Sequence, residues 1–377
     1  MRRSAYVIWQ ISFHVRSTFH DVKHHFMFRV RNISFFYLTD KSKFERIIMK
    51  KTTEKILSQK NKTMPILSFP AAKLLGISVR EMVTDSEVMA SAVAAIAARG
   101  GVGAAVMPMD LSVEAECFGA KVVLGEGEPP AVKCPILDDI SDAETLAVPS
   151  FGVGRSGIFV EGTRKTKALI PDIPIFCGAI GPFSLACRLF DMTELMMECY
   201  DSPEYVAALL SKAADFLIEY ILAHKAAGAS GVILAEPAAG LLSPDMCEEF
   251  SSAYVKRIAE AVEDEDFVFC YHNCGGSVIA CAESIANIGA DIYHFGNAIK
   301  LSDIIGKMPL DSVVMGNVDP VLLRDGTPEG VLAAVDAVFA DCSGFDNFMI
   351  STGCDVPAEA KWENIDAYFS RVSQLYV

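Results

Sequence analysis

From Met64 to the C-terminus, short apolar runs alternate with longer amphipathic stretches, and this alternation limits the possible fold more than any other feature. Seven runs end in Gly, Pro, Asn, Asp or Cys and are predicted strands, at 102–110, 173–182, 231–237, 267–276, 291–297, 312–320 and 348–354. Predicted helices lie between them, for example at 86–99, 202–228, 243–263 and 277–289. Repeated strand–helix units form a parallel sheet that helices cover.

Seven strands, with space for an eighth around residues 157–161, predict a (β/α)8 TIM barrel, an α/β fold. A doubly wound open sheet is the alternative. No G-x-G-x-x-G segment follows a strand and opens a helix, and no G-x-x-x-x-G-K-[ST] segment occurs. The Gly-rich segment 152–157 has no strand before it and is predicted to be a loop. A dinucleotide-binding site therefore has no support.

Residues 1–48 differ in kind from the rest of the chain. They carry a net charge of +6, against −21 for residues 49–377, and they hold four of the seven histidines and none of the 11 cysteines. Their apolar segments lack a period of 2 or 3.6 residues, and no small-residue cleavage site follows the first of them. We predict a basic N-terminal extension, disordered or the product of a mis-assigned start, before a single barrel domain at 49–377. A targeting or partner-binding arm is the alternative.

The charge balance narrows the range of partners. The chain has 33 Lys+Arg against 48 Asp+Glu, whereas nucleic-acid-binding proteins are basic. No stretch approaches the ~18 uninterrupted apolar residues of a transmembrane helix. The cysteines are odd in number and scattered, which favours reduced thiols over a disulfide scaffold. We expect a cytoplasmic protein that binds neither nucleic acid nor membrane.

Chemically capable side chains follow the predicted strands, at the point where each strand ends. Because the C-terminal ends of barrel strands share one rim, where such barrels place their active sites, we expect these side chains to lie close together. They are Asp110, Glu236, His272, Cys274, Asn297, Asn317, Asp319 and Cys354.

The segment His272-Asn273-Cys274 is the most specific of these signals. Residues i and i+2 of a strand point to the same side, so the imidazole of His272 and the thiol of Cys274 face a common point. Cys354 ends a strand three places further on, which in a closed barrel lies across the mouth. One imidazole and two thiolates form a zinc ligand set with an open fourth position, as a catalytic zinc needs. The alternative is that these cysteines only pack, as buried cysteines often do.

Six segments, in this order and spacing, resemble the uroporphyrinogen decarboxylase superfamily. Within it, the resemblance is closest to the zinc-dependent methylcobamide:thiol methyltransferases, typified by the coenzyme M enzymes, and it runs from about Lys50 to the C-terminus. The segments are V-E-A-E-C-F-G-A (113–120), G-A-I-G-P-F-S-L-A (178–186), A-E-P-A-A-G-L-L-S-P (235–244), Y-H-N-C-G-G (271–276), G-N-V-D-P (316–320) and S-T-G-C-D-V-P (351–357).

The resemblance implies a barrel of the uroporphyrinogen decarboxylase type, with zinc held by His272, Cys274 and Cys354. It also implies a reaction, in which a methyl group passes from a methylated corrinoid (methylcobalamin), carried on a partner protein, to a small thiol such as coenzyme M. That corrinoid protein is expected to dock on the rim formed by the strand C-terminal ends. The ligand set agrees, because two thiolates neutralise Zn²⁺ and leave an added substrate thiolate electron-rich.

One position departs from the family. Where coenzyme M methyltransferases carry an acidic residue that completes the zinc shell before substrate binds, this chain has Gly296. His294, Asn297 or water are the candidates for that place. Few Lys or Arg residues lie near the strand ends to bind a sulfonate, so the identity of the thiol stays open.

Two other functions are kept as alternatives. Asp110 falls where uroporphyrinogen decarboxylase has its catalytic aspartate, but region 64–76 lacks the arginines of that enzyme's substrate motif. A polyacid substrate also suits a barrel of net charge −21 poorly. The second alternative is a non-catalytic corrinoid- or metal-binding barrel, which would bind zinc without turnover.

Further roles are predicted from positions at strand ends. Glu236 is expected to face the mouth and to position substrate or handle a proton, with helix capping as the alternative. Asp110 and Asn317 are the other predicted catalytic residues. For Glu114 the alternative to substrate binding is a solvated helix start, and for Asp319 it is an N-cap. The predicted substrate contacts are Glu114, His294, Asn297 and Asp319.

Overall fold

The computed structural model describes residues 25–30, 33–38, 51–59 and 62–376. The chain divides into two compact units, Met1–Ile48 and Met49–Val377, and each is described by itself. In the first unit, β1 (His25–Val30) and β2 (Ile33–Leu38) pair as an antiparallel hairpin, with Val30 opposite Ile33. These two strands are not among those predicted from the sequence. The other residues of the N-terminal extension, which was predicted to be disordered or the product of a mis-assigned start, lie outside the described ones.

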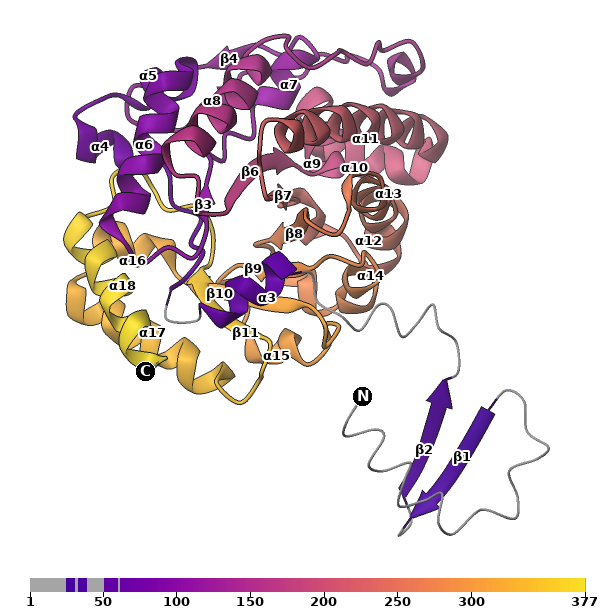
Figure 1. The fold of residues 1–377 in the computed structure, drawn as a ribbon. Helices are drawn as coiled ribbons and strands as arrows, with labels where there is room; N and C mark the ends of the chain where they lie inside the picture. The colour runs from indigo at the N-terminus through magenta and orange to yellow at the C-terminus, as the bar shows by residue number, and fades with distance from the viewer. Residues whose placement is uncertain (1–24, 31–32, 39–50, 60–61, 377) are drawn as a thin grey trace. The chain divides into compact units, whose positions relative to one another are not determined.

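The second unit is built around seven parallel strands in the order β11-β10-β9-β8-β7-β6-β3 (Figure 1). They are β3 (Ala105–Val106), β6 (Ile175–Ile180), β7 (Gly231–Ala235), β8 (Val268–Asn273), β9 (Ile292–Phe295), β10 (Val313–Val318) and β11 (Phe348–Thr352). Each predicted strand segment contains one of them. Nearly all of their residues are buried, as expected when helices cover the outer face and side chains fill the inside. The predicted parallel α/β sheet is confirmed.

The segment around Thr63 and Ile66 takes the place of an eighth strand, between β11 and the start of β3. Thr63 forms a parallel bridge with Val102. On the other side, the N–H of Ile66 donates to Thr352 Oγ1 at 3.2 Å, and the N–H of Val356 donates to the Ile66 carbonyl at 2.9 Å. The sheet therefore closes into a ring, as the predicted (β/α)8 barrel requires.

The predicted eighth strand at 157–161 is wrong, because these residues lie in helix α8 (Ser156–Leu169). The buried side chains of α8 recur at intervals of three or four residues from Ser156 to Thr166, which is the period of a helix. A short apolar run by itself cannot distinguish a buried strand from one face of a helix.

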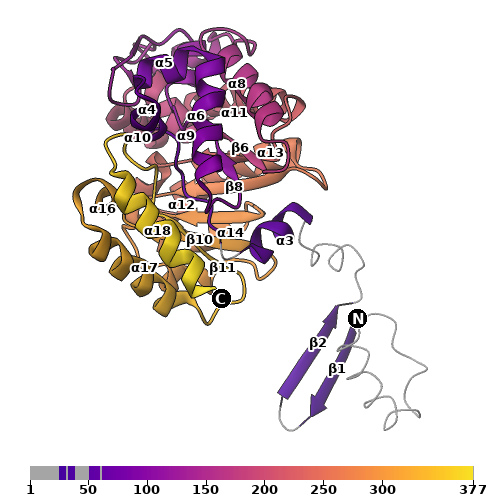
Figure 2. The same ribbon diagram turned by 60° about the vertical axis from the view of Figure 1, so that its left-hand side comes forward.

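Helices surround the ring (Figure 1). Those predicted at 86–99, 202–228, 243–263 and 277–289 are confirmed as α6, α11, the run α12–η4–α13, and η5 with α14. Figure 2 shows the C-terminal helix α18 beside α6, where Arg99 and Asp366 form an ion pair at 2.5 Å. Within the described residues, no helix has both the length and the apolar character of a membrane span. 

The bounds of the helices and of the two short strands are as follows: α3 (Lys51–Ser58), α4 (Ala71–Leu75), α5 (Val79–Thr84), α6 (Ser86–Arg99), α7 (Val113–Cys117), β4 (Val122–Val123), β5 (Ala131–Val132), η2 (Ile140–Glu144), α9 (Pro182–Leu189), α10 (Met192–Asp201), α11 (Pro203–Ala226), η3 (Ala238–Leu241), α12 (Pro244–Cys247), η4 (Glu248–Ser252), α13 (Ala253–Val262), η5 (Gly276–Ile279), α14 (Ala282–Ala286), α15 (Ser302–Ile305), α16 (Pro320–Asp325), α17 (Pro328–Cys342) and α18 (Trp362–Leu375).

Alternate residues of the strands form two buried layers. Side chains that point into the ring make a cluster of their own, separate from the larger cluster between sheet and helices. The inner cluster includes Ile233, Cys270, Ile292, Met315 and Met349. Because side chains alternate along a strand, residues two positions further on also point inward. Among these residues, His272, His294 and Ser351 are polar and lie at the C-terminal end of the ring.

Candidate metal centre

Three side chains with metal-binding atoms converge at the C-terminal ends of β8 and β11. His272 lies near the end of β8, Cys274 follows that strand directly, and Cys354 comes two residues after β11. Their ligand atoms all lie within 4.8 Å of one another, and His272 Nε2 is 3.7 Å from Cys354 Sγ. His272 is buried, whereas both cysteines are half-buried, so the group can be reached from the mouth of the ring.

The arrangement fits a zinc ion. Zinc bonds of ~2.0–2.1 Å to nitrogen and ~2.3 Å to sulfur, at a tetrahedral angle, place the two donor atoms roughly 3.6 Å apart. The separation of His272 Nε2 and Cys354 Sγ, 3.7 Å, is close to this value. One imidazole and two thiols are also donors that zinc prefers. Within the described part of the chain, the group contains three protein donors and no fourth, so one coordination position is left for a ligand from outside.

The protonation of the two thiols is linked. Hydrogen bonds from Cys354 and His272 lower the pKa of Cys274 far below that of a free thiol. The pKa of Cys354 is raised, because its thiol donates to Cys274 and is buried. Burial also raises the pKa of Asp355, whose Oδ1 has no hydrogen-bond partner in the described structure. A cation at this position would favour the thiolate form of both cysteines.

His294 lies behind His272, away from the mouth. The two residues are partners in the register of β8 and β9. Their Nδ1 atoms are 2.8 Å apart, and His294 Nε2 is 2.9 Å from Ser351 Oγ. Burial, followed by the nearby His272, lowers the pKa of His294. Both of its ring nitrogens are occupied within the protein, which leaves no polar atom for the predicted substrate contact or for a fourth metal bond.

The loop after β9 packs tightly against the segment that carries Cys274. A Cβ on Gly296 would lie 2.5 Å from the Cα of Cys274, so the backbone there leaves no space for an acidic side chain. Asn297 is exposed, and its backbone nitrogen lies 2.8 Å from the position of a Cβ on Gly353, next to Cys354. Asn297 is therefore beside the candidate metal centre.

Two other predicted site residues organise the neighbouring backbone. Asn317 is buried, and its Nδ2 donates to the carbonyls of Gly296 at 3.0 Å and Ile299 at 2.8 Å. It thereby holds the loop after β9. Asp319 accepts a hydrogen bond from the N–H of Val321 at 2.9 Å and is the N-cap of α16. This is the contact that the alternative prediction for Asp319 described.

Glu236 caps the start of helix α9. Its carboxylate accepts hydrogen bonds from the N–H groups of Phe183 at 3.2 Å and Ser184 at 2.6 Å, at the start of α9. Burial raises the pKa of Glu236 to about 7. Its neighbour Ala235 belongs to the inner cluster, so Glu236 points outward to the helices. These contacts are the helix capping that the alternative prediction for Glu236 described.

Glu114 is buried and not the solvated helix start of the alternative prediction. Its Oε1 accepts a hydrogen bond from the N–H of Ile180 at 2.9 Å. Its Oε2 is buried and lacks a hydrogen-bond partner in the part of the chain that the structure describes. Burial raises the pKa of this carboxyl to about 7. Glu114 therefore carries a neutral, protonated side chain through the acidic range.

Asp110 forms a buried ion pair with Arg155. The same guanidinium donates to Ser112 Oγ at 2.9 Å and to Glu116 Oε2 at 2.8 Å. The Ser112 hydroxyl in turn donates to Asp110 at 2.6 Å. The carboxylate predicted to be catalytic is thus neutralised and held by neighbouring side chains.

Three residues of this region were not singled out from the sequence: Ser351, Asp355 and Arg155. Ser351 follows the inward-pointing Met349 by two positions, so strand alternation could have found it. Asp355 directly follows Cys354. Arg155 was assigned to a loop, and nothing in its local sequence indicates a partner 45 residues earlier.

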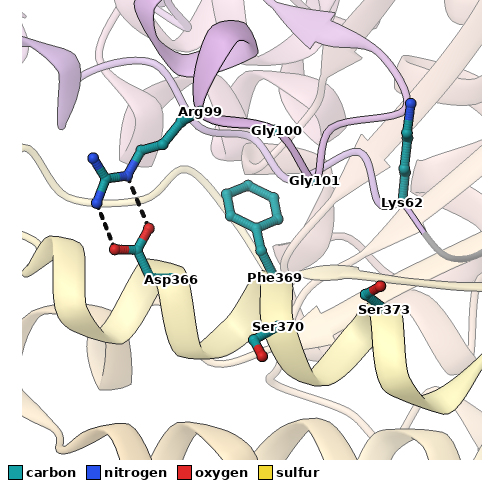
Figure 3. A pocket seen from close by; sticks show the side chains of 8 residues that line it. All are labelled: Lys62, Arg99, Gly100, Gly101, Asp366, Phe369, Ser370 and Ser373. Carbon is teal, nitrogen blue, oxygen red and sulfur yellow. Dashed lines mark hydrogen bonds and ion pairs between the residues drawn. The ribbon is translucent and has the colours of Figure 1, made fainter.

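A surface pocket of about 320 Å³ lies elsewhere (Figure 3). It is lined by Lys62, Arg99, Gly100, Gly101, Asp366, Phe369, Ser370 and Ser373. The two glycines precede the β3 segment, so the pocket is at the N-terminal ends of the strands, opposite the candidate metal centre. Of its two cationic side chains, Arg99 is already paired with Asp366, as Figure 3 shows.

Comparison with known proteins decides the family. The uroporphyrinogen decarboxylase (URO-D) family matches residues 40–375. The chain belongs to this family. Among curated relatives, it is 27% identical to the methylcobamide:CoM methyltransferase MtbA of Methanosarcina mazei over 277 residues, which cover 72% of this chain and 80% of the relative. It is 26% identical to the uroporphyrinogen decarboxylase of Xanthomonas axonopodis pv. citri over 243 residues, 62% of this chain and 67% of the relative.

A solved structure supports the fold of this URO-D family member. A methyltransferase from Methanosarcina mazei superposes with a TM-score of 0.76 at 23% identity, and the match covers 88% of this chain and 100% of that protein. A B12-independent methionine synthase from Shewanella has a TM-score of 0.52 at 16% identity. The predicted barrel of the uroporphyrinogen decarboxylase type is confirmed, and the chain belongs to an enzyme family that includes methyltransferases and decarboxylases.

Proposed function

We propose that this protein is a zinc-dependent methyltransferase that moves a methyl group from a methylated corrinoid, carried on a partner protein, to a small thiol such as coenzyme M. The convergence of His272, Cys274 and Cys354 at the mouth of the barrel, with no fourth protein donor in the described part of the chain, carries the proposal. A bound zinc ion would hold the acceptor sulfur as a thiolate, the form in which sulfur is nucleophilic.

The protein's own residues favour alkylation of sulfur over activation of water. Two cysteine thiolates balance the charge of a divalent zinc, so a third thiolate leaves the site anionic and its sulfur electron-rich. Ligand sets made only of neutral imidazoles keep the metal cationic and suit water activation. The exposed Asn297 beside Cys354 is the side chain we assign to the substrate.

The outer surface of the mouth supports a protein partner. Many of the exposed large apolar side chains lie in connections that lead from the end of a strand to the helix returning to the next one. Exposed apolar groups on one side of a protein are typical of interaction sites. The exposed apolar side chains in these connections are Val148, Phe151, Val153, Met192, Met197, Tyr200, Leu241 and Val321. We assign this surface to the corrinoid protein, in the cytoplasm, where thiol ligands stay reduced.

Decarboxylation is the weaker candidate, although uroporphyrinogen decarboxylases are among the curated relatives. Asp110, the carboxylate that such a reaction would use, is held in a buried ion pair with Arg155. The region at 64–76 also supplies no arginine for a polycarboxylate substrate.

The proposal is tested by metal analysis followed by a methyl-transfer assay. We expect about one zinc per chain in the wild type, its loss in Cys354→Ala, and its retention in Cys134→Ala, which removes an exposed thiol. Demethylation of methylcobalamin is then assayed against a panel of thiols. Absence of zinc from protein purified without chelator would refute the zinc mechanism. Zinc without turnover, even with corrinoid proteins as donors, would identify a binding barrel.

A further inference from the structure

A line of hydrogen bonds crosses the inside of the ring and ends at the candidate metal centre. Ser351 Oγ is 2.9 Å from the carbonyl oxygen of Met64 and 2.9 Å from His294 Nε2. His294 Nδ1 is 2.8 Å from His272 Nδ1. His272 Nε2 then faces Cys354 Sγ at 3.7 Å. Ser351, His294 and His272 are all buried, so water does not replace these contacts.

The directions of these hydrogen bonds follow from a group at the end of the line that can only accept. The Met64 carbonyl has no proton, so the Ser351 hydroxyl must donate to it. Having used its proton, that hydroxyl must accept from His294 Nε2–H. A neutral His294 with its proton on Nε2 has a lone pair on Nδ1, which accepts from His272 Nδ1–H.

A second contact supports the same direction. The backbone carbonyl of His294 lies 3.2 Å from His272 Nδ1. This oxygen too can only accept, so it requires a proton on Nδ1 of His272. A neutral His272 with its proton on Nδ1 has its lone pair on Nε2, the nitrogen that faces Cys354.

We propose that Ser351 and His294 hold His272 in the tautomer that directs Nε2 to the metal, so that His294 is a positioning residue of the metal centre. The inference rests on the proposed zinc-dependent function. Groups behind a ligating histidine commonly set its tautomer and orientation, and their loss weakens metal binding. Here the group is a neutral imidazole and not a carboxylate, so it adds no negative charge behind His272.

The proposal is tested with three single variants, one double variant and two metal probes. His294→Leu removes the acceptor, whereas His294→Asn keeps an oxygen near the place of Nδ1. Ser351→Ala removes the group that assigns the proton of His294. Affinity for Zn²⁺ is measured by competition with a chromophoric chelator, and the site geometry is followed by the absorption of bound Co²⁺. Thermal unfolding of each metal-free protein separates folding from metal binding.

We expect His294→Leu to lower Zn²⁺ affinity about 10–100-fold and to change the Co²⁺ spectrum. His294→Asn should stay within about threefold of the wild type, because the acceptor is preserved. Ser351→Ala should give a smaller loss than His294→Leu. It should have no further effect in the His294→Asn background, since an amide oxygen has no tautomer to assign.

Several outcomes would overturn the inference. One is wild-type affinity and spectrum in a folded His294→Leu; another is an equal loss in the Asn and Leu variants. If the leucine variant does not fold, Ser351→Ala decides, and wild-type affinity there contradicts the proposed line of hydrogen bonds. If the wild type itself binds neither Zn²⁺ nor Co²⁺, the proposed function fails. If it binds both and the variants match it, only the role of His294 fails.

Discussion

The buried carboxyl of Glu236 makes the stability of the barrel depend on pH. Its burial raises the pKa from an ordinary value of 4.5 to about 7, even though N–H groups at the start of α9 favour the charged form. In the unfolded chain the same carboxyl titrates near its ordinary value. Between these two pH values the folded protein binds a proton that the unfolded chain has released, so stability falls as pH rises.

The size of this effect follows from the difference between the two pKa values. Each unit corresponds to about 1.4 kcal/mol, so the shift from 4.5 to about 7 predicts a loss of roughly 3 kcal/mol. The contribution of the protonated carboxyl is complete below about pH 4.5 and is lost as pH rises through about 7. Glu236→Gln keeps the shape of the side chain but cannot ionise. The advantage of the wild type over this variant should therefore shrink by roughly 3 kcal/mol between about pH 4.5 and pH 8.

The assay is urea unfolding of the wild type and Glu236→Gln at closely spaced pH values across this range. Glu260→Gln, which removes an exposed carboxylate from α13, controls for general electrostatic effects. Glu114→Gln provides an independent repeat, because burial raises the pKa of Glu114 to about 7 as well. A difference in unfolding free energy between the wild type and Glu236→Gln that stays constant over the whole pH range would refute the reasoning.

Two further predictions concern backbone packing and a buried charge. Gly296→Ala places a Cβ 2.5 Å from the Cα of Cys274, so it should displace that ligand and lower Zn²⁺ affinity about tenfold or more, as measured by chelator competition. Arg155→Met leaves the buried Asp110 without its cation and should reduce the free energy of unfolding by about 3–5 kcal/mol, as measured by urea titration at neutral pH.

Matched controls separate the effects of Gly296→Ala and Arg155→Met from a non-specific loss of structure. Gly276→Ala meets nothing within 4 Å and should leave Zn²⁺ affinity unchanged; equal losses at both glycines would contradict the packing argument. Arg99→Met breaks the exposed ion pair with Asp366 and should change stability by about 1 kcal/mol or less. If Arg155→Met reduces the free energy of unfolding by no more than this, the buried ion pair with Asp110 does not contribute the predicted stability.

The convergence of His272, Cys274 and Cys354 could be predicted from local rules. Strand alternation places His272 and Cys274 on one side, and the common rim of barrel strands brings Cys354 toward them. Both rules depend on a residue's position along its own strand, so the sequence alone is enough to predict that these three side chains converge. The same holds for the seven strands, whose apolar runs are long enough to recognise.

Other predictions failed or stayed open where the answer depends on which elements become neighbours. The segment at 157–161 has an apolar run, yet its place against α6 and β6 makes it a helix, while the less obvious segment around Thr63 closes the ring. Glu236 ends a strand as expected, but the orientation of that strand turns its carboxylate to α9.

The sequence by itself therefore determined the alternation of strands and helices and the places of His272, Cys274 and Cys354 at strand ends, because periodicity and spacing act along the chain. The family came from the resemblance of six segments to known proteins. Only the tertiary structure decided that Arg155 neutralises Asp110 and that His294 and Ser351 lie behind His272. These contacts join side chains from different strands and loops. Closure of the ring brings these distant segments within hydrogen-bond distance. It also excludes the water that would otherwise compete for the same hydrogen bonds.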